Sequence, residues 1–406
     1  KEEMNGHAFP PMDSCVDLGD VVGAVGDPEN SAPHLHFEVR TRWRHEGGPG
    51  YAQVNPLELG WLHPVDFAYL ARVWVDPAYR GHISFTERLS VPPVLLPSGE
   101  YVVAHSRYLE GIGPGGMSLW RFDMVGSVID LLALPDGRAL AITSENQVLI
   151  VSDGAVRGLW QLGGRASSGA MVDGDRLVVV LDGDTVAAYA LDGALLWTVG
   201  PLPSRLTQWA QSGDRYVFVS ADGALRVIDR AGQMLWETSL NSAPQVFAGA
   251  PSSFIVLHDD SLLTLDSTLA LQIVGQVPRA ITRGAQAVTA ADGSVYLYPG
   301  EGRSLYAFSP AGELRWIGYL PGESVRSPRL AVGGGALVCV LSADGQLLSF
   351  DTRDGRLLGE HSLYTGGLDG GGATARWVHV ADDETVYFSA GFLTVAVLDG
   401  WDLLTR

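Results

Sequence analysis

The feature that most constrains the fold of this chain is a unit of about 40 residues that recurs from residue 90 to the C-terminus. Each copy combines short apolar runs, an Asp/Gly turn and a final run that ends near Trp or Leu. The copies contain SLWRFDMVGSVID (118–130), QVLIVSDGAVRGLW (147–160), TVAAYALDGALLW (185–197), ALRVIDRAGQMLW (224–236), SLLTLDSTLALQI (261–273), SLYAFSPAGELRW (304–316), QLLSFDTRDGRLL (346–358) and FLTVAVLDGWDLL (392–404). These eight similar units predict a chain built by repetition rather than around one core.

The length and the turn chemistry of the unit predict the four-stranded blade of a β-propeller. Asp-Gly pairs at 153–154, 192–193, 222–223 and 344–345 supply the positive φ angles of tight turns between antiparallel strands. A solenoid is the alternative, but a solenoid needs polar capping repeats and none is present at the C-terminus, whereas a closed ring needs no caps. We therefore predict an all-β, eight-bladed propeller over residues 90–406.

Three copies, those ending at Trp197, Trp236 and Trp316, resemble the PQQ-like repeat family, whose units follow a pattern close to DGxLxAxDxxxGxxxW. The resemblance covers roughly three quarters of the chain. It implies that the repeat tryptophans pack between neighbouring blades. In that family, eight-bladed propellers occur both in quinoprotein dehydrogenases and in non-enzymatic scaffold proteins, so the motif specifies a fold and leaves the function open.

The composition excludes several classes of partner. The net charge is −19 and the acidic residues are spread through the turns, so the chain should repel nucleic acid and anionic membrane surfaces. Cys15 and Cys339 are far apart in sequence and predict no disulfide scaffold. No apolar run reaches the roughly 18 residues of a membrane-spanning helix. We expect neither a nucleic-acid partner nor a membrane-spanning segment.

Residues 1–70 contain no copy of the repeat, but they contain ENSAPHLHFEVR at 29–40. If this run is a strand, His34, His36 and Glu38 face one side, because side chains alternate along a strand. Two adjacent imidazoles suit a zinc ion and a neighbouring base. The pattern alone leaves open that both histidines are ordinary strand residues.

A longer stretch, LGDVVGAVGDPENSAPHLHFEVR followed by VNPLELGWLHP, resembles the C-terminal half of the lysostaphin/LytM-type zinc endopeptidases. The resemblance implies that His36 is a zinc ligand and that His34 helps to activate the attacking water. Zinc would polarise the scissile carbonyl of a peptidoglycan peptide and lower the pKa of the bound water to about 7.

The other half of that family's site is missing from the sequence. The upstream H-x-x-x-D ligand motif is absent, and His7, 27 residues before His34, is the candidate counterpart of a further catalytic histidine. The resemblance therefore implies a chain that begins partway through a peptidase domain and that lacks efficient hydrolase activity by itself. The predicted domains are a partial peptidase β-sheet domain (1–70), a linker (71–89) and the propeller (90–406).

The remaining polar groups carry weaker signals. His45, His63 and His82 lie in loop-like sequence and are predicted to be solvated. The turn LDGD at 181–184 is a candidate Ca²⁺ site, but it lacks the alternating oxygen ligands and the terminal Glu of a dedicated calcium loop.

Three functions follow from these motifs. The first is a peptidoglycan-directed zinc metalloendopeptidase, fused to a propeller that binds peptidoglycan peptide or another protein, in the cell envelope or outside the cell. The second is a non-catalytic scaffold with a degenerate peptidase-like domain. The third, a quinone-dependent dehydrogenase, ranks last because Cys15 and Cys339 are not the adjacent pair that many such enzymes carry, so we expect no PQQ.

Overall fold

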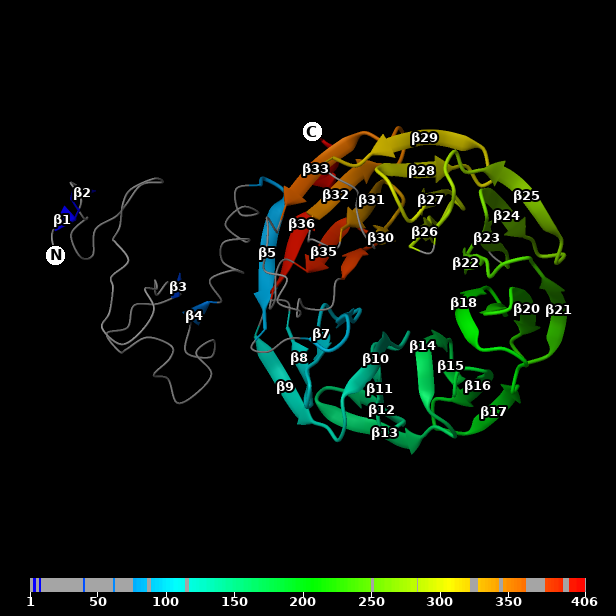
Figure 1. Cartoon of the computed structure of the whole chain (residues 1–406). Coiled ribbons are helices and arrows are strands. Elements are labelled where there is room, and N and C mark those ends of the chain that lie inside the picture. The colour runs from blue at the N-terminus through cyan, green and yellow to red at the C-terminus, as the bar shows by residue number, and fades with distance from the viewer. Residues whose placement is uncertain are drawn as a thin grey trace. The chain divides into compact units, whose positions relative to one another are not determined.

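The computed structural model describes residues 3–4, 7–8, 39–40, 61–62, 76–85, 89–113, 117–249, 252–282, 284–321, 328–342, 346–362, 377–389 and 394–405. The chain divides into two compact units, Lys1–Pro64 and Val65–Arg406. Figure 1 shows the second unit as a ring of blades.

Two short antiparallel pairs are described in the first unit. β1 (Glu3–Met4) pairs with β2 (His7–Ala8), and β3 (Val39–Arg40) pairs with β4 (Trp61–Leu62). β3 is the end of the HLHFEVR run, so this much of the predicted strand is present.

The second unit consists, over its described residues, of eight four-stranded antiparallel sheets. Blades 1 to 4 comprise β6 (Val94–Leu95), β7 (Tyr101–Ala104), β8 (Tyr108–Ile112), β9 (Ser118–Asp123); β10 (Val128–Ala133), β11 (Ala139–Thr143), β12 (Gln147–Ser152), β13 (Ala155–Gln161); β14 (Ala166–Asp173), β15 (Arg176–Leu181), β16 (Thr185–Ala190), β17 (Leu195–Val199); and β18 (Leu206–Ser212), β19 (Arg215–Ser220), β20 (Ala224–Asp229), β21 (Met234–Ser239). Blades 5 to 8 comprise β22 (Gln245–Ala248), β23 (Phe254–His258), β24 (Ser261–Leu265), β25 (Leu271–Gln276); β26 (Gln286–Thr289), β27 (Val295–Tyr298), β28 (Ser304–Phe308), β29 (Leu314–Tyr319); β30 (Arg329–Val332), β31 (Leu337–Leu341), β32 (Gln346–Asp351), β33 (Leu357–Ser362); and β34 (Val378–Val380), β35 (Thr385–Ser389), β36 (Thr394–Asp399), β5 (Tyr79–Ser84). The predicted all-β, eight-bladed propeller is confirmed.

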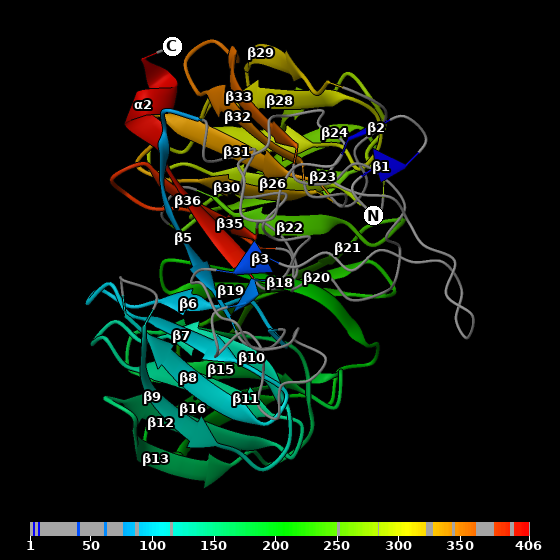
Figure 2. The same ribbon diagram turned by 90° about the vertical axis from the view of Figure 1, so that its left-hand side faces the viewer.

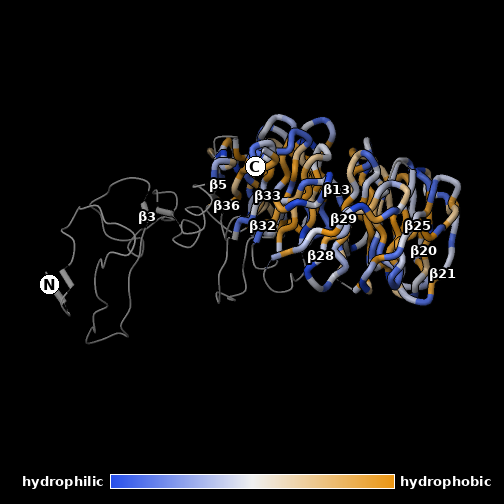
Figure 3. Tube along the Cα trace, turned by 90° about the horizontal axis from the view of Figure 1, so that it is seen from above, coloured by the Kyte–Doolittle hydropathy of each residue, from blue (hydrophilic) through white to orange (hydrophobic). Residues whose placement is uncertain are grey.

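Burial explains why the strands of one blade differ in sequence. In blades 1 to 7 the first strand faces the centre of the ring and the fourth lies on the rim (Figure 1). The second strand of blade 2, β11, is buried at every position, whereas the rim strand β9 alternates between exposed and half-buried residues. Inner strands are covered by neighbouring blades on both faces and therefore read as continuous apolar runs. Figure 3 shows hydrophobic residues along the strands and hydrophilic residues at the turns.

The repeat tryptophans pack between blades, as the PQQ-like resemblance implied. Trp197 of blade 3 lies against Gly232 of blade 4, where a Cβ atom would come within 2.7 Å of the indole ring. Gly232 has a φ of +81°, a backbone conformation that favours glycine. Glycine is therefore required at this turn both by the backbone and by the close contact with the indole ring. The indole Nε1 of Trp197 donates to the carbonyl of Arg230 at 3.0 Å, and that of Trp316 donates to Thr352 at 2.9 Å.

Trp160 departs from this register by two residues. Gly158 lies opposite Ile150, at the place in the sheet where Trp197 lies opposite Ala188. The indole Nε1 of Trp160 is buried and has no hydrogen-bond partner among the described residues. Blade 2 thus keeps the tryptophan contact without its hydrogen bond.

The ring is closed by a strand from the other end of the repeat region. β5 pairs with β36 and forms the outer strand of blade 8, so the sheet combines residues from the start and the end of the propeller (Figures 1 and 2). β5 lies inside 71–89, the range predicted as a linker, and this strand corrects that prediction. The sequence did not predict β5 because its six residues, YRGHIS, alternate too little between apolar and polar side chains to identify a strand.

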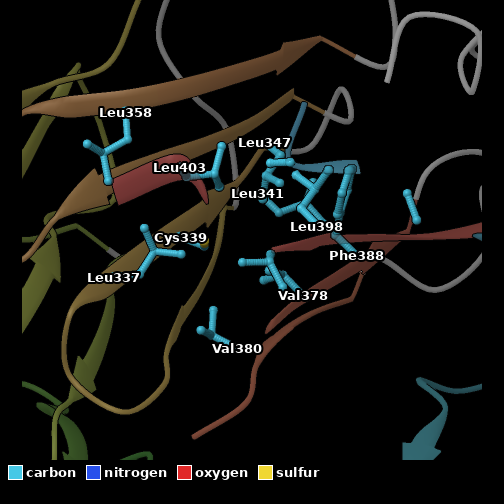
Figure 4. Close-up of a cluster of buried hydrophobic side chains, with 13 residues drawn as sticks. Leu337, Cys339, Leu341, Leu347, Leu358, Val378, Val380, Phe388, Leu398 and Leu403 are labelled. Atoms are coloured by element: carbon cyan, nitrogen blue, oxygen red, sulfur yellow. The ribbon is translucent and has the colours of Figure 1, made fainter. Parts of the chain in front are cut away.

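A short helix, α2 (Gly400–Leu404), follows β36 and packs on the closing blade. Asp399 caps it by accepting from the backbone N–H groups of Trp401 and Asp402. Leu403 is fully buried beside Cys339 and Phe388 in one apolar cluster (Figure 4). Within the described residues, no helix has the length and the apolar character to cross a bilayer.

Candidate functional site

The predicted zinc site falls largely outside the described residues. His34, His36 and Glu38 are not among them, and His7 is described only as a backbone position in β2. The same-face arrangement of His34 and His36, the zinc ligation and the role of His7 therefore stay predictions. Within the described part of the chain, no group of three or more His, Cys, Asp and Glu side chains is arranged to hold a metal ion.

His82 is not the solvated loop residue that was predicted. It lies in β5 opposite Ala396, half-buried, and its Nδ1 is 2.5 Å from the hydroxyl of Tyr79. Burial lowers the pKa of its imidazole. The prediction failed because the closing strand was not recognised.

A cleft with polar walls is formed by residues of blades 2 and 3 and of the connection from blade 3 to blade 4. It contains two adjoining cavities, of ≈ 280 Å³ and ≈ 520 Å³, which share Arg165, Ala166 and Ser167. The larger one is formed by the turn 182–184 between β15 and β16 and by the connection 202–205 between blades 3 and 4. This position on connecting loops is typical of binding sites on rigid scaffolds.

Main-chain hydrogen bonds hold these loops in place. The N–H of Leu206 donates to the carbonyl of Gly183 at 2.7 Å, and that of Leu202 donates to Asp184 at 2.9 Å. On the other side of the turn, the N–H of Asp182 donates to the carbonyl of Arg165 at 2.8 Å. The turn is therefore anchored to the connections on both sides, and the side chains of the cleft project from fixed backbone.

Two arginines in the cleft are unpaired. Within the described part of the chain, the guanidinium groups of Arg165 and Arg205 make no hydrogen bond or ion pair, although the net charge of the chain is −19. Some arginines elsewhere are engaged; Arg230, for example, binds Asp173 and Asp175, each at 3.0 Å. Arg205 lies across Gly183, where a Cβ atom would come within 3.0 Å of its Nε.

The carboxylates of the cleft are occupied by local donors. Asp182 accepts from the backbone N–H of Arg165 at 3.2 Å, and Asp184 accepts from the hydroxyl of Thr185 at 3.0 Å. The cleft therefore offers guanidinium donors, which suit a carboxylate or another planar oxyanion. One carboxylate oxygen of each Asp in the turn 182–184, the turn that was weighed as a Ca²⁺ site, thus accepts a hydrogen bond from within the protein.

Asp130, on the inner strand β10, lines the smaller cavity and was not identified from the sequence. Its Oδ2 accepts from the backbone N–H of Ala170 at 2.6 Å, across the gap between the inner strands β10 and β14. Gln208 makes the equivalent bridge from β18, accepting from the N–H of Val246 at 3.1 Å and donating to its carbonyl at 2.8 Å. Burial raises the pKa of the Asp130 carboxyl. A polar residue at the third position of an inner strand is the signal that identifies such bridges.

One further group resembles catalytic machinery. The hydroxyl of Ser242 lies 3.2 Å from Nε2 of His258, and Oδ2 of Asp259 lies 3.5 Å from its Nδ1. A hydrolase triad requires a buried carboxylate hydrogen-bonded to Nδ1. Asp259 is 70% exposed and its oxygen lies beyond ordinary hydrogen-bond distance from Nδ1, so it does not serve as the buried carboxylate of a triad.

Comparison with known proteins agrees with the propeller. The model of the family described as "Outer membrane protein assembly factor BamB" matches residues 101–280 and 277–399. Among solved structures, BamB from Moraxella catarrhalis is 17% identical, has a TM-score of 0.58 and is covered over 99% of its length by 79% of this chain. The computationally designed Ika8 protein is 16% identical, has a TM-score of 0.61 and is covered over 99% of its length by 78% of this chain.

The two structural matches establish a shared fold only, because their identity to this chain is low. A search of curated proteins found no match. The family model covers most of the repeat region and includes strands from each of the eight blades. The chain therefore belongs to the family of repeat propellers described as outer membrane protein assembly factor BamB.

Proposed function

We propose that this chain is a protein-interaction scaffold of the cell envelope and that its propeller binds a partner through the cleft of Arg165 and Arg205. The observation that carries the proposal is the pair of unpaired guanidinium groups beside a cavity on an otherwise acidic protein. The partner segment would present a carboxylate, from an Asp or Glu side chain or from a chain terminus. The cell-envelope location rests on the family's description.

Binding of a capped, glutamate-rich peptide tests the cleft. We expect Arg165→Ala and Arg205→Ala each to raise the dissociation constant about tenfold, because removal of one charged partner costs about 1.4 kcal/mol or more. Arg356→Ala is the matched control, since Arg356 is an exposed arginine that lies outside the cleft. Equal losses in all three variants would indicate non-specific charge attraction and would contradict the proposal.

A second function rests on the motif PHLHFEVR. We propose that the intact protein also carries a zinc metalloendopeptidase directed at peptidoglycan, with His36 as a ligand and His34 as the residue that activates water. This sequence alone supplies one recognised ligand, His36, where a catalytic zinc site needs three. Metal analysis after dialysis and release of amino groups from purified cell walls test it, with less than one zinc per chain and no turnover expected here. Stoichiometric zinc with turnover abolished by His36→Ala would show that the chain is active by itself.

A further inference from the structure

The smaller cavity of the cleft lies beside irregularities in two neighbouring inner strands. Where β10 pairs with β11, Ile129 has no partner residue, and where β14 pairs with β15, Ser167 and Gly169 have none. All three bulge residues line this cavity, whose volume is ≈ 280 Å³. A β-bulge leaves its extra residue outside the ladder, bends the strand and redirects a side chain. The backbone of blades 2 and 3 is therefore shaped around the cavity.

The inner strand of blade 3 is more irregular than those of the other blades. The first strands of blades 2 and 4, β10 and β18, have one irregularity of register each, whereas β14 has two. Among the described strands, those that begin the other blades, β6, β22, β26, β30 and β34, have a regular register. Gly169, at the additional bulge, has a φ of +42°, a conformation that favours glycine. The additional bulge is therefore a local feature of the cleft and not a property of the repeated blade.

The smaller cavity has an apolar floor. Ile142 of blade 2 and Val179 of blade 3 line it, and both belong to the buried cluster between these blades. Ile129 also lines the cavity, yet this isoleucine is 43% exposed. An apolar side chain that entered the cavity would contact the floor and cover part of Ile129, which the hydrophobic effect favours. The cavity therefore suits an apolar group.

The polar groups of the smaller cavity do not suit an anion. Each carboxylate oxygen of Asp130 accepts a hydrogen bond from a backbone N–H, at 2.6 Å and 3.0 Å. The hydroxyl of Ser167 donates to the carbonyl of Val180 at 3.2 Å. The Oδ1 of Asn146 is buried and has no hydrogen-bond partner among the described residues. Because a negative group would be repelled by the Asp130 carboxylate, an uncharged side chain is favoured here.

The cationic groups lie at the edge of the smaller cavity and in the larger one. Arg165 lines both cavities, and Arg205 lines the larger. In the described part of the chain, neither guanidinium group has a hydrogen bond or an ion pair. Asp182 and Asp184 line the larger cavity as well, so its charged side chains balance. One carboxylate can therefore bind to the guanidinium groups, whereas a run of acidic residues would meet these two Asp side chains and the net charge of −19.

The two cavities meet at residues 165–167, so a ligand fills both only if its carboxylate and its apolar group diverge from nearly one point. The last residue of a polypeptide has this arrangement, because its carboxylate and its side chain are bonded to the same Cα atom. In an internal Asp or Glu, the carboxylate ends the side chain and the main chain continues in both directions. The geometry of the cleft therefore favours a chain terminus over an acidic side chain.

We propose that the cleft binds the free C-terminus of a partner polypeptide whose last side chain is apolar, with the carboxylate at Arg165 and Arg205 and the side chain in the smaller cavity. This inference rests on the proposed function and narrows its partner to one chemistry. Ligand pockets of about 300–1,000 Å³ hold ligands of drug size, so the larger cavity, of ≈ 520 Å³, takes the preceding main chain as well. A free amino acid would leave most of it empty.

Calorimetric titration of the whole chain with N-acetylated peptides tests the inference. The reference peptide, acetyl-Gly-Ser-Gly-Ser-Leu, ends in a free carboxylate, and two further peptides end in Leu amide or in Ser with a free carboxylate. We expect amidation to raise the dissociation constant about tenfold and the change from Leu to Ser to raise it about fivefold. A ratio below about twofold in either comparison would overturn the proposal. Binding of free leucine as tight as that of the reference peptide would overturn it as well.

Two variants assign the two parts of the ligand to the two cavities. Arg205→Ala should remove most of the difference between acid and amide and keep the preference for Leu over Ser. Ile129→Ser should do the reverse, since Ile129 lines only the smaller cavity. Ile273→Ser is the matched control, because Ile273 is exposed on β25 of blade 5 and should keep both differences. Both isoleucines are exposed, so neither substitution should prevent folding, and equal effects of the two would contradict the place of the side chain.

The same peptides separate this inference from the proposed function. If the capped, glutamate-rich peptide bound through Arg165 and Arg205 while the acid and the amide of the Leu peptide bound equally, the cleft would be a site for acidic side chains. Only the present inference would then fail. If the binding of every peptide were independent of both arginines, the proposed function would fail with it.

Discussion

The interface between blades 3 and 4 and the seam between blades 7 and 8 have an equivalent position between the blades, and different side chains fill it. In blade 3, Trp197 lies opposite Ala188 and packs against the turn of the next blade. The corresponding position of blade 7 is Gly359, opposite Ser349. There, Leu403 of α2 lies 3.3 Å from where a Cβ atom of Gly359 would be. The seam thus replaces the tryptophan of the seventh copy with a leucine from the end of the eighth copy, where the chain forms a helix.

This difference explains a gap in the repeat pattern. The seventh copy lacks its tryptophan, and the sequence alone suggests simple degeneracy. The structure shows that the space is occupied by the C-terminal helix, while the strand that completes blade 8 comes from residues 79–84. Interior interfaces are therefore encoded by the repeat itself, whereas the closing interface depends on β5, which precedes the first copy, and on the helix at the end of the eighth copy.

Removal of β5 should have the largest effect on stability, because β5 completes the blade that closes the ring. A chain that begins at residue 86 should lose cooperative unfolding or aggregate, because β36 becomes an unpaired edge and the buried Ile83 and Phe85 are lost. A chain that begins at residue 75 keeps β5 and should unfold within a few degrees of the full chain. Calorimetry of both chains checks this, and equal stability of the two would mean that β5 does not close the ring in solution.

Leu403→Ala tests whether the helix truly substitutes for a tryptophan. Leu403 is fully buried in the seam cluster, so we expect a loss of about 2–5 kcal/mol in the free energy of unfolding. Leu225→Ala, at an equally buried leucine between blades 4 and 5, is the matched control and should cost a similar amount. Denaturant titration measures both. A cost below about 1 kcal/mol at Leu403 alone would mean that α2 is only loosely attached.

The tryptophans of blades 2 and 3 sharpen the comparison at interior interfaces. Trp197→Phe removes the hydrogen bond to Arg230 and leaves its buried carbonyl without that donor, so we expect a cost of about 1–3 kcal/mol. Trp160→Phe removes a buried N–H that has no partner among the described residues, so this variant should cost less. Equal costs in thermal or chemical unfolding would show that the hydrogen bond contributes nothing beyond ring packing.

The smallest expected effect is at Asp130, on the inner strand of blade 2. Burial raises the pKa of this carboxyl, so the folded state holds the proton more tightly than the unfolded state does. Its contribution therefore favours folding at low pH and is lost as the pH rises through the raised value. Asp130→Asn should change stability at pH 7 by less than about 1 kcal/mol and reduce the loss of stability as the pH rises above the ordinary range of an Asp carboxyl.

Asp136→Asn in the same blade should act with the opposite sign. The side chain of Arg138 lowers the pKa of Asp136, so its stabilising contribution is present at neutral pH and is lost as the pH falls. Unfolding midpoints measured across the pH range compare the two variants. Changes of the same sign would contradict the assigned environments.

The repeated apolar runs and Asp/Gly turns were enough to predict most strands of the propeller from the sequence. Runs such as DRLVVVLDGD and TVAAYALDGALLW identify buried strands and their turns, because only a strand covered on both faces accepts so many consecutive apolar residues. The number of blades followed from the same repetition, and the place of Trp197, Trp236 and Trp316 between blades followed from the resemblance to the PQQ-like repeat family.

The candidate cleft was beyond prediction from the sequence. Arg165 and Arg205 are 40 positions apart, and nothing in their local sequence shows that both lack partners in the described structure. Asp130 was equally hidden, since its partner is a backbone N–H in another blade. Conversely, the histidines of PHLHFEVR carry a specific local motif whose chemistry the sequence predicts and the described residues do not test.

The sequence by itself determined the repeated blade, because strand periodicity and Asp/Gly turns act over a few neighbouring residues. Tertiary structure alone decided how the ring closes, which arginines stay unpaired and which histidine meets Asp76. These contacts join residues far apart in the chain, such as Asp76 with His361 and Arg80 with Asp399. Their existence depends on the curvature that brings the eighth blade back to the first, and that is a property of all the interfaces together.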